Sequence, residues 1–327
     1  MKKQALFGLK CIVSAVLIWL VLRDVDFQSV YSLGKNAKWT PILIASFLLL
    51  LHVVIVAWRW GAVLNAIDAP LSFRKVFKYS YISIFFNQVL PASIGGDVIR
   101  VYMAYKSGLR FGQAFNSTIL DRVASLVSIA VLMLISFPLL LNTIDDFSFG
   151  VAIVGTILCV LLSFGTLFYL DKLLAALHRW PFARNLTALV SDARRTFLIG
   201  CNVFPILGIS ILGHLNLAMA SYLIAYSLGI QVSLFECLVL FPPVLLLSSL
   251  PISIAGWGVR EGAMVMAFSF VGVPGSSAFT LSVIFGLASI VVNLPAGILW
   301  SVGGNEISAG NPIRQGKGEI RKSWWQR

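Results

Sequence analysis

Arginine and carboxylate side chains lie inside or beside long apolar segments of this 327-residue chain. A charged side chain at bilayer depth costs about 2.5–3.5 kcal/mol, so such residues normally face a polar space and serve a function. Guanidinium groups form forked hydrogen bonds with phosphate and carboxylate oxygens. The pattern therefore indicates recognition of an anion. The residues concerned are Asp97, Arg100, Asp121, Arg122, Arg260 and Glu261.

Two of these arginines end the two copies of a repeated motif. Leu90–Arg100 reads LPASIGGDVIR, Leu250–Arg260 reads LPISIAGWGVR, and Leu, Pro, Ser, Ile, Gly and Arg recur at the same places. Each copy interrupts an apolar run with Pro and Gly, which disfavour a continuous helix. Interrupted apolar segments at matching places in two halves of a membrane protein point to a transporter-type binding site.

The glycines of the motif suggest further groups that bind anions. Backbone amides at the start of a short helix favour anions such as phosphate. The alternative is that the glycines only allow helices to pack closely, which is common in membranes. Asn87, just before the first break, is suited to satisfy backbone groups that the break frees. The expected substrate-binding residues are Arg100, Arg260, Arg122, Gly95, Gly96, Gly256, Gly258 and Asn87.

The acidic residues are expected to orient these arginines or to couple a proton. Asp97 and Arg100 are three residues apart, so they share a helix face and are able to pair. A purely structural role, in which Asp97 caps the short helix, is the alternative. The three coupling or orienting residues are Asp97, Asp121 and Glu261.

Neighbouring charges along one helix are expected to point in different directions. Arg260 and Glu261 are adjacent, so we expect them not to neutralise each other and at least one to face a polar space. Asp121 and Arg122 have the same spacing. Their alternative is a place near the lipid headgroups, where Arg122 extends its long side chain to water.

Composition places the chain in a membrane. Hydrophobic residues make up 58% of the chain and charged residues 12%, and the mean hydropathy is +0.90. Soluble domains carry about 25% charged residues. The alternating segments of about 10 residues that mark an outer-membrane barrel are not seen. The fold class is therefore all-α, a polytopic membrane protein.

Motifs for enzymes and cofactors are not found in the sequence. There is no nucleophile elbow, zinc-protease helix motif or phosphate-binding loop, so we expect no enzyme, no cofactor and no metal. The four cysteines have no ligand spacing and are interpreted as buried apolar residues. His52 and His214 fall in apolar segments, where hydrogen bonds between helices are favoured over proton transfer.

Six segments are long enough to span the membrane, since about 20 apolar residues are needed. Two broken regions, from about Phe77 to Tyr105 and from about Leu234 to Val271, are expected to form re-entrant hairpins, because each of their arms is too short to span. The expected spans are Leu6–Leu22, Pro41–Leu64, Phe115–Leu141, Phe149–Leu170, Val203–Leu228 and Ala278–Val302.

The basic residues predict the orientation. Most of them fall in segments predicted to lie inside, and only Arg23, Lys35 and Lys38 lie in predicted outer loops. This bias places both termini in the cytoplasm and explains the net charge of +12 without nucleic acid. The two hairpins then open from opposite faces, as an inverted repeat. We expect a cell inner (plasma) membrane protein; its oligomeric state is left open.

One large inner segment and the C-terminal residues lie outside the predicted spans. Residues 171–200 combine spaced leucines with basic residues, which favours an amphipathic helix on the membrane surface. We divide the chain into one transmembrane domain, residues 1–303, and a basic cytoplasmic tail, residues 304–327.

Taken together, these residues resemble the lysylphosphatidylglycerol synthase transmembrane-region family of flippase-like proteins. The resemblance rests on Asn87–Pro91, Gly95–Arg100, Asp121-Arg122 and Gly256–Glu261, with the aromatic–arginine pair of Trp58–Trp60, and covers about residues 5–303. It implies two re-entrant regions around a lipid-sized cavity. Because the chain has no room for the namesake's aminoacyl-transferase domain, we expect a stand-alone member without that activity.

The resemblance implies a lipid translocase. The substrate would be a polar, phosphate-bearing membrane lipid, anionic or linked to a sugar. One alternative is a non-transporting subunit that presents a lipid to a partner glycosyltransferase or another lipid-modifying enzyme. A transporter of a soluble anion is the third possibility.

Overall fold

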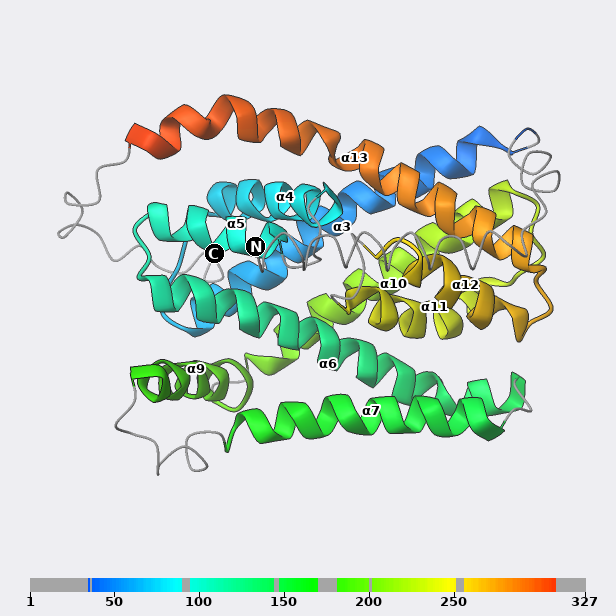
Figure 1. Ribbon diagram of the computed structural model, residues 1–327, viewed down its shortest axis with the longest axis horizontal. Coiled ribbons are helices and arrows are strands. Elements are labelled where there is room, and N and C mark those ends of the chain that lie inside the picture. The colour runs from blue at the N-terminus through cyan, green and yellow to red at the C-terminus, as the bar shows by residue number, and fades with distance from the viewer. Residues whose placement is uncertain are drawn as a thin grey trace, which may run out of the picture.

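The computed structural model describes residue 35 and residues 37–89, 95–143, 147–169, 181–199, 202–250 and 256–309. The secondary structure in these ranges is helical throughout, which confirms the all-α class. The helices form one elongated bundle in which most axes run along its length (Figure 1). Buried apolar side chains form two clusters, one around Trp60 and Leu64 and the other around Phe241 and Phe268.

The described helices form two units of four, with two further helices between them. The first unit contains α3 (Trp39–Ala66), α4 (Phe73–Val89), α5 (Gly95–Lys106) and α6 (Phe111–Thr143). The second contains α10 (Val203–Ser227), α11 (Leu234–Ser249), α12 (Val259–Ser269) and α13 (Gly275–Ala309). Between them lie α7 (Phe147–Leu167) and α9 (Pro181–Phe197).

Four of the described helices are long and apolar enough to cross a membrane, namely α3, α6, α10 and α13. They match four of the six predicted spans. The fifth, predicted over Phe149–Leu170, corresponds to the 21-residue helix α7. The first, Leu6–Leu22, lies outside the described residues. Helix α13 continues to Ala309, past the expected domain end at residue 303, and residues 310–327 are also outside the described part.

Both regions predicted to be broken consist of two short helices. Helices α4 and α5 have 17 and 12 residues, and α11 and α12 have 16 and 11. At 1.5 Å per residue, each measures about 17–26 Å, less than the hydrocarbon thickness of about 30 Å. The segments that join them, residues 90–94 and 251–255, lie outside the described residues.

Helices α4 and α5 pack side by side as an antiparallel hairpin. The hydroxyl of Tyr79 contacts that of Ser107 at the open end, and the Gly96 amide reaches Asn87 near the tip. In Figure 1 this hairpin opens towards one end of the bundle, and the α11–α12 hairpin opens towards the other. The described inner ends of α4 and α11 therefore both lie towards the middle of the molecule (Figure 1).

The contacts between helices are the same in both units. If α3, α4, α5 and α6 are matched in order with α10, α11, α12 and α13, each of the main helix contacts within one unit has a counterpart in the other. The same correspondence applies to contacts between the units. Helix α4 packs on α13 as α11 packs on α6, and α3 packs on α13 as α10 packs on α6.

The two units meet chiefly through α3 and α10. The Lys38 amide at the start of α3 donates to the Ser227 carbonyl at the end of α10, at 3.0 Å. Further along, the Asn216 side chain donates to the Leu48 carbonyl at 2.8 Å. These bonds show that the two corresponding helices run antiparallel, as they do in Figure 1.

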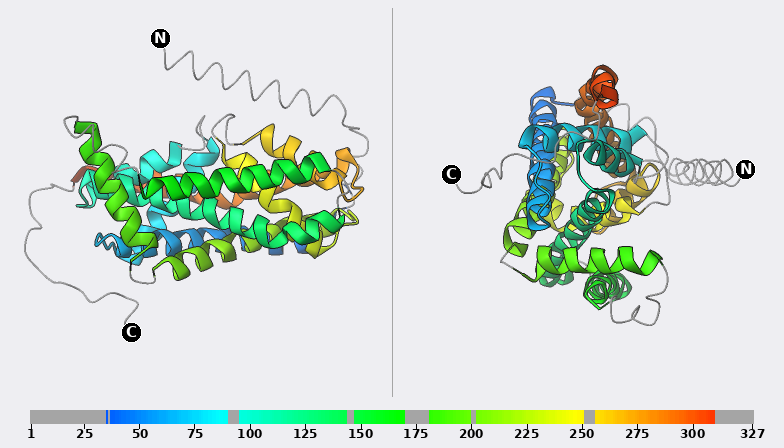
Figure 2. Two further views of the ribbon diagram at one scale, coloured as in Figure 1. Left: turned by 90° about the horizontal axis from the view of Figure 1, so that it is seen from below. Right: turned by 90° about the vertical axis from the view of Figure 1, so that its left-hand side faces the viewer.

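Helix α9 is amphipathic, as predicted for this segment. Its apolar side buries Leu189, Val190 and Phe197, and it packs on α6 and α3. In Figures 1 and 2, α9 lies across the end of the bundle, roughly perpendicular to the long helices. Since α6 and α3 contact it, part of its apolar face is covered by the protein itself.

Candidate functional site: a charged cavity between the first hairpin and the second unit

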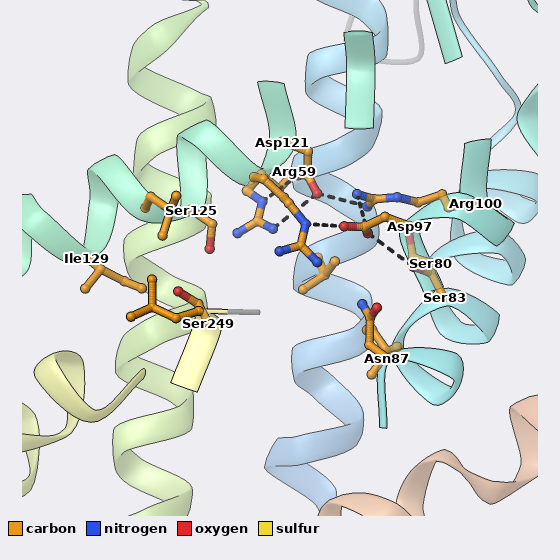
Figure 3. Close-up of a pocket in the computed structure, with 15 residues that line it drawn as sticks. Arg59, Ser80, Ser83, Asn87, Asp97, Arg100, Asp121, Ser125, Ile129 and Ser249 are labelled. Carbon is orange, nitrogen blue, oxygen red and sulfur yellow. Dashed lines mark hydrogen bonds and ion pairs between the residues drawn. The ribbon is translucent and has the colours of Figure 1, made fainter. Parts of the chain in front are cut away.

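A cavity of about 370 Å³ lies beside the first helical hairpin. Its wall is formed by α3, α4, α5 and α6, and Ser249 and Leu250 at the end of α11 also line it. Both broken regions therefore contribute to the wall. Figure 3 shows that its polar side chains converge from several helices.

Five charged side chains form a continuous network in the cavity wall. Arg59 donates to both oxygens of Asp121, at 2.7 and 3.3 Å. Arg100 donates to the same carboxylate at 2.9 Å and pairs with Asp97 at 3.2 Å. Arg122 pairs with the second oxygen of Asp97. We call Arg59, Asp121, Arg100, Asp97 and Arg122 the charged network.

The charged network carries one excess positive charge, since three arginines face two aspartates. Asp121 and Arg100 are 2% and 3% exposed. Burying ions is costly unless their hydrogen bonds are satisfied. Two donors remain uncommitted, because Nε of Arg100 and Oγ of Ser80 are buried with no hydrogen-bond partner in the described part of the chain. The excess charge and spare donors suit an anionic ligand.

Local sequence explains why Asp97 and Arg100 reach the network. They lie in the first two turns of α5, three residues apart, and share one face, so the predicted pair is confirmed. Asp97 also lies where the helix dipole stabilises a carboxylate. Arg100 is additionally held over the ring of Trp60, 4.9 Å from the centroid, and this contact ties α5 to α3.

Gly96 serves close packing rather than offering a free amide. Its N–H already donates to Oδ1 of Asn87 at 2.9 Å, so Asn87 satisfies the freed backbone as expected. A Cβ atom at Gly96 would lie 1.8 Å from the Ser83 carbonyl oxygen. The tight-packing alternative for this glycine therefore holds. Gly95 begins the same helix and is half-buried.

The second copy of the motif builds a separate polar cluster. Arg260 pairs with Glu261 at 2.7 Å and donates to Ser282 at 3.1 Å. The expectation that these adjacent charges do not neutralise each other was therefore wrong. Space explains the difference, since a Cβ at Gly286 of α13 would lie 2.3 Å from the Arg260 guanidinium. The glycine leaves the room that the Arg260 guanidinium occupies beside Glu261.

The glycines of the second copy have backbone roles. Gly256 and Gly258 have φ angles of 81° and 84°, in the region that L side chains rarely adopt. The Gly258 N–H donates to the Glu261 carboxylate, so this amide is also committed. Arg260 lies over the ring of Trp257 and, with Glu261, is not among the residues that line the charged cavity.

Comparison with known proteins identifies the family. The model of the lysylphosphatidylglycerol synthase transmembrane region matches residues 8–297. The chain belongs to this family. It is 23% identical to a UPF0104 membrane protein of Methanothermobacter thermautotrophicus over 88% of this chain and 90% of that protein. A UPF0104 membrane protein of Methanocaldococcus jannaschii is 20% identical over 86% and 90%. One of Pyrococcus horikoshii is 28% identical over 42% and 41%.

Sequence reasoning placed half of the polar residues that line the cavity of this family member. Arg100, Arg122, Asp97, Asp121 and Asn87 do line one cavity. The polar cavity residues that it missed contribute a third arginine and four hydroxyl groups. The one signal for this arginine was the aromatic–arginine pair quoted for the family resemblance. The missed residues are Arg59, Ser80, Ser83, Ser125 and Ser249.

Proposed function

We propose that this protein binds the phosphate-bearing headgroup of a membrane lipid in the charged cavity and moves that lipid between leaflets. The observation that carries the proposal is the buried network with its excess positive charge, held among helices of spanning length. Among the described residues of the network, three arginines face two aspartates, so an anionic headgroup would add a favourable counter-charge.

The three arginines differ in exposure, which suggests an order of contact. The Arg122 side chain is 31% exposed, while those of Arg59 and Arg100 are 9% and 3% exposed. Arg122 is placed to meet the phosphate first. The free Nε of Arg100 and the Ser80 hydroxyl then provide donors deeper inside. Asp97 and Asp121 hold the guanidinium groups in place.

The arrangement of the helices supports movement by alternating access. We propose that the two units are an inverted repeat and that both hairpins re-enter the membrane from opposite faces. The matching contacts, the antiparallel α3 and α10, and the opposed hairpins support this reading. In such transporters, one repeat rocks against the other around a fixed central site.

The distribution of basic residues supports an orientation in a plasma membrane. The end of the bundle that holds α9 also holds the start of α4, with Arg74 and Lys75 (Figure 1). The end of α5 and the start of α6, with Lys106 and Arg110, lie there too. The opposite end has Lys35 and Lys38. By the positive-inside rule, the α9 end faces the cytoplasm.

Reconstitution into liposomes tests the proposal. Fluorescent phosphatidylglycerol is incorporated in both leaflets, and dithionite quenches only the outer pool. With the wild-type protein, we expect nearly complete quenching, against about half in protein-free vesicles. Arg122→Gln and Arg100→Gln should slow the exchange at least about tenfold, since each removes a charge-assisted contact.

A matched control removes a charge elsewhere. Arg110 is exposed at the start of α6 and does not line the cavity, so Arg110→Gln should flip lipid at the wild-type rate. Equal rates in Arg122→Gln, Arg100→Gln and wild type would remove the cavity from the mechanism. Tight binding of phosphatidylglycerol without any exchange would instead favour the subunit that presents a lipid to a partner enzyme.

A further inference from the structure

Two histidines lie at the contact between the two units. His52 is near the middle of α3 and His214 near the middle of α10, the antiparallel pair that joins the units. Nε2 of His214 lies 3.0 Å from Oγ of Ser128 and 3.1 Å from the Ser125 carbonyl of α6. The predicted hydrogen bonding between helices is therefore confirmed for His214.

Each of the two histidines also has one ring nitrogen, Nδ1, without a partner among the described residues. Nδ1 of His52 and Nδ1 of His214 are both buried, and neither has a hydrogen-bond partner in the ranges that the structure describes. Buried polar atoms are normally paired, so an unpaired one calls for an explanation. A role in accepting a proton would explain why these imidazole nitrogens are left unpaired.

Ser125 connects this histidine pair to the charged cavity. It lines the cavity, and its hydroxyl oxygen lies 3.5 Å from Nε2 of His214. Arg59 of the charged network follows His52 by seven residues on α3, so the two side chains lie about two turns apart on the same helix. An anion that enters the cavity therefore changes the electrostatic potential at the histidines, because the apolar surroundings screen charges only weakly.

The remaining ionisable groups on the elements packed around His214 are few. Helix α6 contributes Asp121 and Arg122, both in the charged network. Helix α11 contributes Glu236 and Cys237 at its start, with Glu236 held by the Ser233 cap. The only ionisable residue in the sequence of α13 is Glu306, near its end.

We propose that His214, with His52 beside it, is a proton-binding site coupled to the charged cavity, so that an anionic headgroup binds together with a proton. The inference rests on the proposed function. A bound phosphodiester offsets the charge of Arg59 and makes a proton on the imidazole more favourable. Coupling is reciprocal, so a lower pH must tighten headgroup binding by the same factor.

Isothermal titration calorimetry of the purified full chain measures this coupling. Short-chain dioctanoyl phosphatidylglycerol is titrated near pH 6.5 in buffers of different ionisation enthalpy, and the heat difference gives the protons taken up. The phosphodiester does not titrate at this pH, so uptake belongs to the protein. We expect net proton uptake when the wild type binds lipid, and an affinity that rises as the pH falls from 8 to 6.

Variants assign the proton to the pair. His214→Asn should bind the lipid within about threefold of wild type but take up less than about 0.1 proton. His52→Asn is a second variant, with a smaller expected loss. His178→Asn removes the third histidine of the chain, outside the described residues, and should leave proton uptake unchanged.

The outcomes separate the two proposals. Lipid binding by the wild type without proton uptake, or undiminished uptake in a folded His214→Asn, overturns the proton site and leaves the proposed function standing. Failure of the wild type to bind phosphatidylglycerol overturns the proposed function and, with it, this inference. Even if a variant does not fold, the wild-type titration by itself separates lipid binding without proton uptake from failure to bind.

Discussion

Nη1 of Arg100 donates to Oδ2 of Asp121 at 2.9 Å, which ties the second arm of the first hairpin to the long helix that follows it. Asp121 also accepts from Arg59 of α3, so one carboxylate joins three helices. This carboxylate is the centre of the charged network. The position of the hairpin and the charge of the cavity therefore depend on the same residue.

Replacing Asp121 with Asn should be strongly destabilising. Arg59 would then lose the carboxylate that it pairs with, and Arg100 would keep only Asp97. Breaking a buried ion pair from one side costs about 3–5 kcal/mol. Thermal unfolding in detergent measures the loss. Asp68→Asn is the control, because the Asp68–Arg195 pair is largely exposed and should contribute under about 1 kcal/mol. Equal effects of both substitutions would contradict a structural role of the network.

Gly96→Ala should disrupt the first hairpin. The added methyl would lie 1.8 Å from the backbone oxygen of Ser83, and a backbone atom has no other rotamer. We expect a loss of at least about 3 kcal/mol, or no folded protein. Gly112→Ala in α6 has no atom within 4 Å of the new carbon and should be neutral or slightly stabilising. A well-folded Gly96→Ala protein with full stability would refute the close approach of α4 and α5.

Gly286→Ala should displace the Arg260 guanidinium and break its bond with Glu261. Because the obstacle is a flexible side chain, the expected loss is smaller, about 1–3 kcal/mol. A double-mutant cycle tests the cause. Since Arg260→Gln has a shorter side chain, adding Gly286→Ala to it should cost almost nothing more. Additive losses would show that Gly286 acts through another neighbour.

The attachment of α9 should weaken as pH rises. Burial raises the pKa of Asp192, although the Asn116 hydrogen bond and the charge of Arg195 act in the opposite direction. The folded protein therefore binds more protons than the unfolded chain between about pH 3.8 and the raised pKa of Asp192. Stability is greatest below this pH range and falls as the pH rises through it. Asp192→Asn should flatten this dependence, measured by hydrogen exchange in α9 between pH 4 and 7. An unchanged pH profile in that variant would assign the effect to another group.

Much of the fold followed from apolar length and from the residues that interrupt it. Runs longer than about 20 apolar residues predicted α3, α6, α10 and α13, because a helix satisfies its own backbone in lipid. Pro and Gly in the two motif copies predicted where α4 and α11 end. The pairing of Asp97 with Arg100 was also predictable, since helix geometry alone brings residues three apart together.

Other contacts were decided by packing between helices distant in sequence. Arg59 meets Asp121 across 62 residues, and no spacing rule indicates that contact. The sequence predicted that Arg260 and Glu261 point apart, but the space left by Gly286 lets them pair. The sequence thus determined which segments enter the membrane region and which residues carry charge. Only the tertiary structure decided which charges meet, because buried charges are stabilised by the partners that packing brings within reach.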